Sequence, residues 1–270
     1  MRTAQRILLL VALAGLALGA SGCNKLKARD RLNKGVQAYK QAKYEDAIER
    51  FKEAVELDPQ LKNAKLYLAT AYAQQFIPGV ESPENMRTAE LAIEQYSKVL
   101  EGDPRDLTSL KGIASLYFNM KKFDKSKEYH RKVMEVDPND PETYYSIAVI
   151  DWTESYALRQ EKRAAIGLQP TEPLKDKKVC AELVQANSTR VEEGIDLLKK
   201  AIDLRPDYDD AMAYLNLLYR EKADIQCDNP ELRAELLKLA DEMVEKTMAV
   251  KQKRAAEAEK HAPGGVTLGQ

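Results

Sequence analysis

The sequence predicts an all-α solenoid of about five helix pairs, with an extended helical hairpin in the fourth pair and a C-terminal capping helix. Similar dipeptides end four amphipathic segments, at Asp58-Pro59, Asp103-Pro104, Asp137-Pro138 and Arg205-Pro206. Their prolines are 45, 34 and 68 residues apart, which corresponds to a 34-residue period with insertions. A unit of this length accommodates two helices of about 12 residues joined by tight turns. The 12 glycines and 11 prolines among 270 residues leave little material for a large β-rich architecture.

The first 22 residues have the features of an export signal. Arg2 and Arg6 precede an uncharged run of 14 residues, from Ile7 to Ala20. A membrane-spanning helix needs about 20 apolar residues, so this run is too short to span a bilayer comfortably. Its length is typical of the apolar region of a signal peptide. We therefore expect residues 1–22 to direct export and to be absent from the folded protein.

The residues before Cys23 resemble the lipobox of bacterial lipoproteins, because Ala20, Ser21 and Gly22 are all small. The resemblance implies a diacylglyceryl group on the Cys23 sulfur and an added acyl chain, which together anchor a protein stably. Residues 23–27 would form a lipidated tether. Asn24 is not the aspartate that retains enterobacterial lipoproteins in the inner membrane, so we expect the outer membrane, facing the periplasm. The alternative is an ordinary cleaved signal with an incidental cysteine.

The stretch YKQAKYEDAIERFKEAVELDP is similar to the tetratricopeptide repeat (TPR) pattern. That pattern has a small residue or Gly at position 8, Ala at 20, an aromatic at 24, Ala at 27 and Pro at 32. With Ala28 as position 1, these positions hold Gly35, Ala47, Phe51, Ala54 and Pro59. The resemblance implies a TPR-type α-solenoid with repeats at about 28–61, 62–106, 107–140, 141–208 and 209–250. The helix end and a disordered tail would occupy 251–270.

Helix packing explains these residue types. Small side chains at positions 8, 20 and 27 let neighbouring helices approach closely, and a large one at position 24 fills the space between them. The residue before a proline is disfavoured in the α region, so each Asp-Pro pair ends the second helix of its repeat.

Two insertions interrupt the period. The second repeat gains a loop around Gln74–Met86, in which Ser82-Pro83-Glu84 predicts an N-cap, a proline at the first helical position and an acidic first turn. Loops of this kind often carry specificity, but we interpret this one as a tolerated insertion. The fourth repeat gains about one repeat length, with helical patterns from Pro141 to about Leu168 and from about Asp176 to Leu204. This hairpin is either an arm with a partner face or self-association surface, or an elaboration that packs on the next repeat.

Cys180 and Cys227 both lie between the two helices of their repeats. In a TPR stack these connections lie on the same edge, and export would place them in an oxidising compartment. We expect a Cys180–Cys227 disulfide. The alternative is two unbonded thiols, since a long hairpin could carry Cys180 away from Cys227.

Composition and motifs argue against several classes of function. The formal net charge is −1, from 42 Lys and Arg against 43 Asp and Glu, so we expect no nucleic-acid binding driven by positive charge. Two His and three Cys nearly exclude a zinc site. We find no G-x-S-x-G, H-E-x-x-H, C-x-x-C or Walker motif and expect no enzyme activity, cofactor or metal. His130 occupies an aromatic core position, so we interpret it as a packed histidine and not a general base.

The TPR resemblance also implies a partner-binding groove, lined by the first helix of each repeat at positions 2, 5, 9, 12 and 13. The predicted groove residues are Tyr39, Lys40, Leu66, Thr70, Lys111, Phe118, Asn119, Tyr145, Val149, Trp152 and Arg220. Trp152 either faces the groove or packs under the long hairpin. Chaperone-binding TPRs hold a C-terminal carboxylate with a Lys and Asn set that this chain does not reproduce, so we do not expect that ligand.

These features predict a membrane-anchored scaffold or adaptor of the bacterial cell envelope that binds a protein or peptide partner in the groove. The membrane contact would be the lipidated N-terminus. The alternative is a structural envelope protein that forms a homo-oligomer through the hairpin of the fourth repeat. The sequence does not identify the partner.

Overall fold

The computed structural model describes residues 23–169, 172 and 174–261, and every regular element within these ranges is a helix. The predicted leader at 1–22 and the predicted tail from residue 262 lie outside the described residues. The chain forms two compact units, residues 1–133 and 134–270. Within the described ranges, no helix has both the length and the apolar composition needed to cross a bilayer. The predicted all-α fold class is therefore confirmed.

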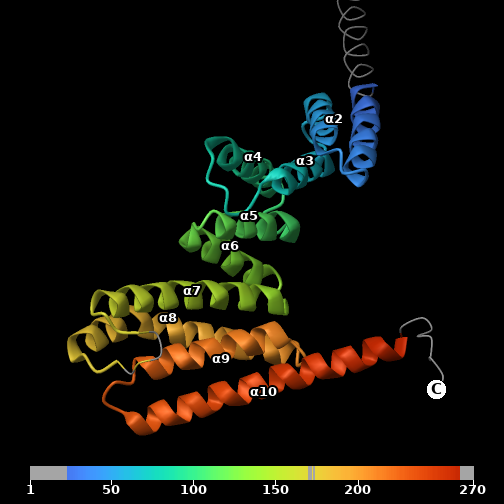
Figure 1. Cartoon of the computed structure of the whole chain (residues 1–270). Coiled ribbons are helices and arrows are strands. Elements are labelled where there is room, and N and C mark those ends of the chain that lie inside the picture. Colours follow the sequence, from blue (N-terminus) through green and yellow to red (C-terminus); the bar gives the residue numbers. More distant parts are fainter. Residues whose placement is uncertain (1–22, 170–171, 173, 262–270) are drawn as a thin grey trace, which may run out of the picture. The chain divides into compact units, whose positions relative to one another are not determined.

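The first unit begins with a helix over residues 23–40 (Figure 1). It continues with α2 (Tyr44–Leu57), α3 (Lys62–Gln75), α4 (Pro83–Leu100), α5 (Leu107–Asn119) and α6 (Phe123–Val136), whose last turn crosses the unit boundary. From α2 to α5 each helix packs on the next, and α3 also contacts α5. Residues 23–27, which we expected to form a tether, are helical. This segment contains no Gly or Pro, and Lys and Leu are good helix formers.

Close helix approach in the first unit occurs at the predicted small residues. Gly35 lies against Phe51, which is fully buried, and a methyl group at Gly35 would lie only 2.5 Å from the Phe51 ring. In the same way, a methyl group at Gly112 would lie 2.6 Å from the Tyr96 ring. Ala47 and Ala54 are also fully buried. The first helix pair thus packs a large ring against a glycine, as positions 8 and 24 of the repeat pattern predict.

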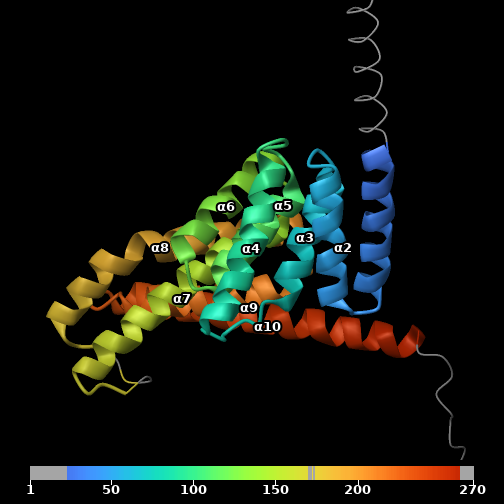
Figure 2. The same ribbon diagram turned by 90° about the horizontal axis from the view of Figure 1, so that it is seen from above.

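The second unit consists of α7 (Pro141–Ala165), α8 (Lys177–Leu204), α9 (Asp209–Asp224) and α10 (Pro230–His261). With 25 and 28 residues, α7 and α8 form the predicted extended hairpin and lie side by side in Figures 1 and 2. α9 packs on α7, α8 and α10. A methyl group at Gly194 of α8 would lie 2.7 Å from Leu218 of α9, so these helices also meet at a glycine.

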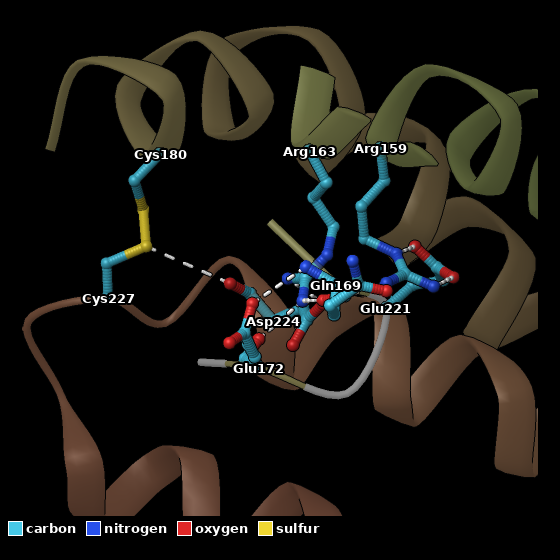
Figure 3. Close-up of polar contacts among 8 residues, drawn as sticks. All are labelled: Arg159, Arg163, Gln169, Glu172, Cys180, Glu221, Asp224 and Cys227. Carbon is cyan, nitrogen blue, oxygen red and sulfur yellow. Dashed lines mark hydrogen bonds and ion pairs between the residues drawn. A yellow bond between two sulfur atoms is a disulfide. The ribbon is translucent and has the colours of Figure 1, made fainter. Parts of the chain in front are cut away.

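A buried ionic cluster holds the tip of the α7–α8 hairpin against α9 (Figure 3). The Arg159 guanidinium makes two bonds to Glu221, with Nε–Oε2 at 2.7 Å and Nη2–Oε1 at 2.9 Å. Its Nη1 lies 2.9 Å from Asp224 Oδ2. Only 3% of the Glu221 side chain is exposed. Bidentate pairs of this kind fix geometry as well as contributing energy, because both planar groups must align.

Arg163 continues this cluster toward the turn between α7 and α8 (Figure 3). Its side chain is 1% exposed, and its Nη1 lies 3.3 Å from the same Asp224 oxygen. Its Nη2 donates to the carbonyl oxygens of Gln169, at 2.6 Å, and Glu172. The hairpin tip therefore packs on the next helix pair, which is the second of the two alternatives that the sequence left open.

A disulfide between Cys180 and Cys227 makes a second connection at the hairpin tip, with 6.4 Å between the two Cα atoms. Cys180 lies in the first turn of α8, and Cys227 lies in the loop between α9 and α10. This is the pairing expected from the sequence. The long hairpin does not carry Cys180 away, because the ionic cluster brings the tip to the end of α9.

Glu221→Gln should lower the unfolding free energy of the second unit by about 3 kcal/mol, because it leaves the largely buried Arg159 without its bidentate partner. Urea unfolding can be followed by the emission of Trp152, the single tryptophan. Glu192→Gln is the matched control, since Glu192 pairs with Lys222 at 2.7 Å but is 52% exposed. The loss of unfolding free energy in this control should stay below about 1 kcal/mol. Equal losses in the two variants would contradict a stabilising role for the cluster.

The disulfide should be detectable in the exported protein by intact mass and alkylation. Without reductant, Cys180 and Cys227 should resist alkylation, and reduction should add the mass of two hydrogen atoms. The double variant Cys180→Ser, Cys227→Ser should lose up to about 4 kcal/mol of stability in the chain-entropy model. Two alkylatable thiols at these positions in native, exported protein would show that the bond does not form.

Candidate functional site

Three aromatic rings lie together on α7 and α9, the first helices of the two pairs in the second unit. Two of them were predicted as groove residues, and the third was not. Tyr145 and Trp152 lie on α7, seven residues and thus about two turns apart. Tyr214 of α9 lies between them, with its ring centroid 5.5 Å from Tyr145 and 5.3 Å from Trp152. Both contacts are edge-to-face, with interplanar angles of 86° and 85°. This is a favourable aromatic geometry, so the three rings position one another.

The row extends along α7 to Tyr156, whose ring stacks on Trp152 at 5.1 Å. Tyr156 is 39% exposed, and the other three rings are partly exposed. Trp152 is thus partly exposed and contacts rings of both α7 and α9. We call the set Tyr145, Trp152, Tyr156 and Tyr214 the α7–α9 aromatic face.

Arginines lie at both ends of the row. The Arg159 guanidinium lies 5.3 Å from the Tyr156 ring centroid. At the other end Tyr208 contacts Tyr145 at 5.2 Å, and the Arg205 guanidinium lies 4.4 Å from the Tyr208 ring. Guanidinium groups at these distances interact favourably with an aromatic face. Because Arg159 also binds Glu221, the docked hairpin tip helps to position the aromatic row.

Burial controls the protonation of the tyrosines at this end of the row. It raises the pKa of Tyr145 and of Tyr208, and Glu142 raises the pKa of Tyr208 further. Both phenols therefore keep their protons at neutral pH. The Tyr208 hydroxyl donates to Glu142 Oε2, and Glu142 also pairs with Arg205 at 2.6 Å. Tyr208 is buried and hydrogen-bonded, so it supports the row and is not part of its exposed surface.

Of the predicted groove residues in the second unit, Val149 is covered, and Arg220 is exposed but paired with neighbouring side chains. Val149 is only 8% exposed, so its prediction as a groove residue is wrong. It lies on α7 between Tyr145 and Trp152, where its short side chain is covered. Arg220 is exposed, but it binds Asn216 Oδ1 at 2.8 Å and Asp241 Oδ1 at 2.6 Å. Arg220 therefore makes a polar link between α9 and α10.

The predicted groove residues of the first unit are more dispersed. Tyr39 contacts the Tyr44 ring edge-on at 5.3 Å, and Lys40 is exposed. Leu66 packs on the first unit's core. Thr70 Oγ1 donates to the Leu66 carbonyl at 2.9 Å and lies 3.2 Å from the Tyr96 hydroxyl. These contacts bind the side chains to their own unit, and residues 23–133 contain no row of rings comparable to that on α7 and α9.

The remaining first-unit predictions lie on α5. Lys111 is partly buried, and Phe118 contacts Phe123 at 5.9 Å. Asn119 Nδ2 donates to the Ser115 carbonyl at 3.0 Å. His130 on α6 is 8% exposed, in agreement with its interpretation as a packed histidine.

Sequence reasoning missed Tyr214 as a site residue and did not assign Tyr156 to the groove. Tyr214 follows Asp210 by four residues, and Tyr156 follows Trp152 by four. Residues at this spacing lie on the same face of a helix. Extending the predicted residue Trp152 by one turn would therefore have identified Tyr156, whereas Asp210 was not a predicted groove residue and gave no such lead to Tyr214.

The loop of the second repeat is ordered by a single buried side chain. Asn85 Nδ2 donates to the Ile77 and Val80 carbonyls at 2.8 and 2.6 Å, and Asn85 Oδ1 accepts from the Ile77 amide at 2.9 Å. Ser82 Oγ accepts from the Asn85 amide at 3.2 Å, so the predicted N-cap is confirmed. Val80 is exposed and lines an open pocket of about 410 Å³, and Ile77 is exposed as well. Phe76, Met86 and Met120 contribute to its lining.

Comparison with known proteins supports the repeat assignment. A family model of the tetratricopeptide repeat matches residues 112–140, which include most of α5 and all of α6. A search of curated protein sequences finds no match.

Similar solved structures belong to TPR proteins. A crystal structure of MamA covers 89% of this chain and 98% of its own, with a TM-score of 0.57 and 14% identity. MamA from Desulfovibrio magneticus RS-1 covers 84% and 96%, with a TM-score of 0.56 and 17% identity. YrrB, described as a TPR protein with an unusual peptide-binding site, covers 83% and 90%, with a TM-score of 0.51 and 13% identity. At these identities the similarity concerns the fold, so the chain has a TPR-type helical fold with one repeat identified at 112–140.

Proposed function

We propose that this chain is a membrane-anchored protein–protein interaction adaptor of the bacterial cell envelope. In this proposal Cys23 carries the lipid anchor, and a segment of the partner protein binds the α7–α9 aromatic face. The observation that carries the proposal is the row of partly exposed rings on two adjacent first helices. Tyr and Trp are enriched among the residues that dominate binding energy at protein interfaces.

The fold supports a binding role for this face. First helices of TPR-type pairs present their side chains along one surface, and α7 contacts α9 directly. YrrB is a TPR protein with a peptide-binding site, and its structure has the same fold as this chain. A rigid aromatic row gives a large contact area with little loss of side-chain entropy on binding, because each ring has only two rotatable bonds.

The sequence before Cys23 supports membrane anchoring, and the described structure is compatible with it. Cys23 is exposed and therefore accessible to modification. The helix over 23–40 contains Cys23 itself, so a lipid on this sulfur would join the first unit without an intervening loop.

The hairpin supports an adaptor better than a self-associating arm. Its tip residues Arg159 and Arg163 bind Glu221 and Asp224, and Cys180 is joined to Cys227. These charged side chains and thiols already bind partners within the protein. The tip therefore has fewer groups that could bind a second copy of the chain than an isolated arm would have.

Capture from crosslinked cell envelopes tests the binding face. The double variant Tyr145→Ala, Trp152→Ala should reduce capture of the partner about 30-fold or more, because together the two truncations remove central aromatic contacts worth at least about 2 kcal/mol. Tyr67→Ala is the control, since Tyr67 is 38% exposed but lies in the first unit. The control should capture the partner as wild type does. Undiminished capture by the double variant would place the binding surface elsewhere.

Lipidation can be tested separately in a bacterial host. Wild-type protein should enter the detergent phase after cloud-point separation and carry the mass of a diacylglyceryl group at Cys23. Cys23→Ser should enter the aqueous phase, because it lacks the acceptor sulfur. Asn24→Cys, with Cys23→Ser, provides a control for the position of the thiol. A mature wild-type N-terminus without lipid would support the ordinary cleaved signal instead.

A further inference from the structure

The α7–α9 aromatic face carries hydrogen-bond donors that the protein itself does not use. Within the described part of the chain, the hydroxyls of Tyr145, Tyr156 and Tyr214 and the indole N–H of Trp152 make no hydrogen bond. Other tyrosines in the same protein do find partners: Tyr208 donates to Glu142, Tyr144 donates to the Pro138 carbonyl at 2.9 Å, and the Tyr96 hydroxyl pairs with Thr70. The face thus combines exposed ring surface with four available donors.

The three arginines around the face are already paired with carboxylates. Arg159 binds Glu221 and Asp224, Arg205 binds Glu142, and Arg220 binds Asp241. None of these three guanidinium groups is left to hold a carboxylate or phosphate without breaking an existing pair. The surface therefore favours a ligand that is recognised through ring contacts and its carbonyl oxygens, and not through an anionic group.

A proline-rich segment has these properties. Proline has no backbone N–H, and a polyproline II helix has no internal hydrogen bonds, so its carbonyl oxygens remain free to accept. Proline rings pack on aromatic side chains, and aromatic-lined surfaces are the common receptors of such segments. The donors of Tyr and Trp then bind the free carbonyls while the rings contact the prolines.

The spacing of the rings fits this conformation. Tyr145 and Trp152 are seven residues apart on α7, which is a rise of about 10.5 Å along the helix. One turn of a polyproline II helix contains three residues and rises about 9.3 Å. Prolines three residues apart can therefore contact Tyr145 and Trp152, with Tyr214 between them.

We propose that the α7–α9 aromatic face binds a proline-rich segment of the partner in the polyproline II conformation. This inference rests on the proposed binding function of the same face. It assigns the rings to proline contacts and the four donors to backbone carbonyls of the segment.

The test uses the full chain in detergent micelles and three synthetic peptides of equal length without aromatic residues. The first has prolines at every third position, the second contains only Gly and Ser, and the third is acidic with a free C-terminus. Trp152 is the only tryptophan, so its emission reports directly on the face. The proline peptide should change the emission saturably, and the other two should bind at least 10-fold more weakly.

Ring-preserving variants test the donors while the packing is retained. Tyr145→Phe and Tyr214→Phe should each lower the affinity for the proline peptide about 2- to 13-fold. This range corresponds to the usual net free energy of one hydrogen bond. Tyr219→Phe is the matched control on α9, because Tyr219 is buried outside the row, and it should bind as wild type does. Unchanged affinity in both row variants would overturn the assignment of the donors.

Two outcomes separate this inference from the proposed function. If the aromatic double variant loses the partner from envelopes but the proline peptide does not bind, the adaptor function holds and the proline-rich segment is wrong. Tighter binding of the acidic or the Gly-Ser peptide would also overturn the inference. If the double variant keeps the partner, the proposed binding face itself fails.

Discussion

Close approach between helices at small residues determines most of this structure. Gly35 meets the Phe51 ring, Gly112 meets the Tyr96 ring, and Gly194 meets Leu218. At each point one additional carbon would lie less than 3 Å from its neighbour, so the facing side chain or the helix that carries it would have to shift. Dense packing of this kind leaves no room for the larger side chain. The separation of the helices within each unit, and therefore the position of the side chains that they present, follows from this constraint.

The aromatic face depends on the same constraint in the second unit. Gly194 of α8 also lies close to α7, because a methyl group at this residue would lie 3.2 Å from Asp151 Cβ. α7 and α9 are thus both fixed against α8. The Arg159–Glu221 pair then sets the far end of α7 relative to the end of α9. Tyr214 can contact both Tyr145 and Trp152 because these two sets of contacts fix the neighbouring helices in register.

Much of the fold was predictable because it depends on local chemistry. Pro59, Pro104, Pro138 and Pro206 follow the ends of helices, and Ser82 caps α4, because proline and serine act through their immediate backbone neighbours. Phe51 and Gly35 were predictable from the repeat pattern, which records how two helices pack. Residues 23–27 are helical, and the expectation of a lipidated tether gave no information about their conformation.

The candidate site was only partly predictable. Tyr145 and Trp152 followed from their positions in the repeat, but Val149, on the same stripe, is covered. The exposure of a side chain on a helix face depends on the size of the side chains around it. A residue's position in the repeat pattern does not describe these neighbours. The burial of Arg163 had no signal at all in the sequence. Its partners include the carbonyl oxygens of Gln169 and Glu172, and backbone groups of a turn have no residue-specific pattern.

The disulfide has a mechanical consequence for a chain held at one end. Cys180 and Cys227 are 47 residues apart in sequence, but their Cα atoms are 6.4 Å apart. A force that pulls on the two ends of the chain passes through the sulfur bridge, and the residues between the cysteines stay outside the loaded path. Fully extended, that length of chain would add about 155–170 Å. The bridge therefore limits how far the second unit can stretch under load, and it keeps Tyr214 inside the unloaded loop.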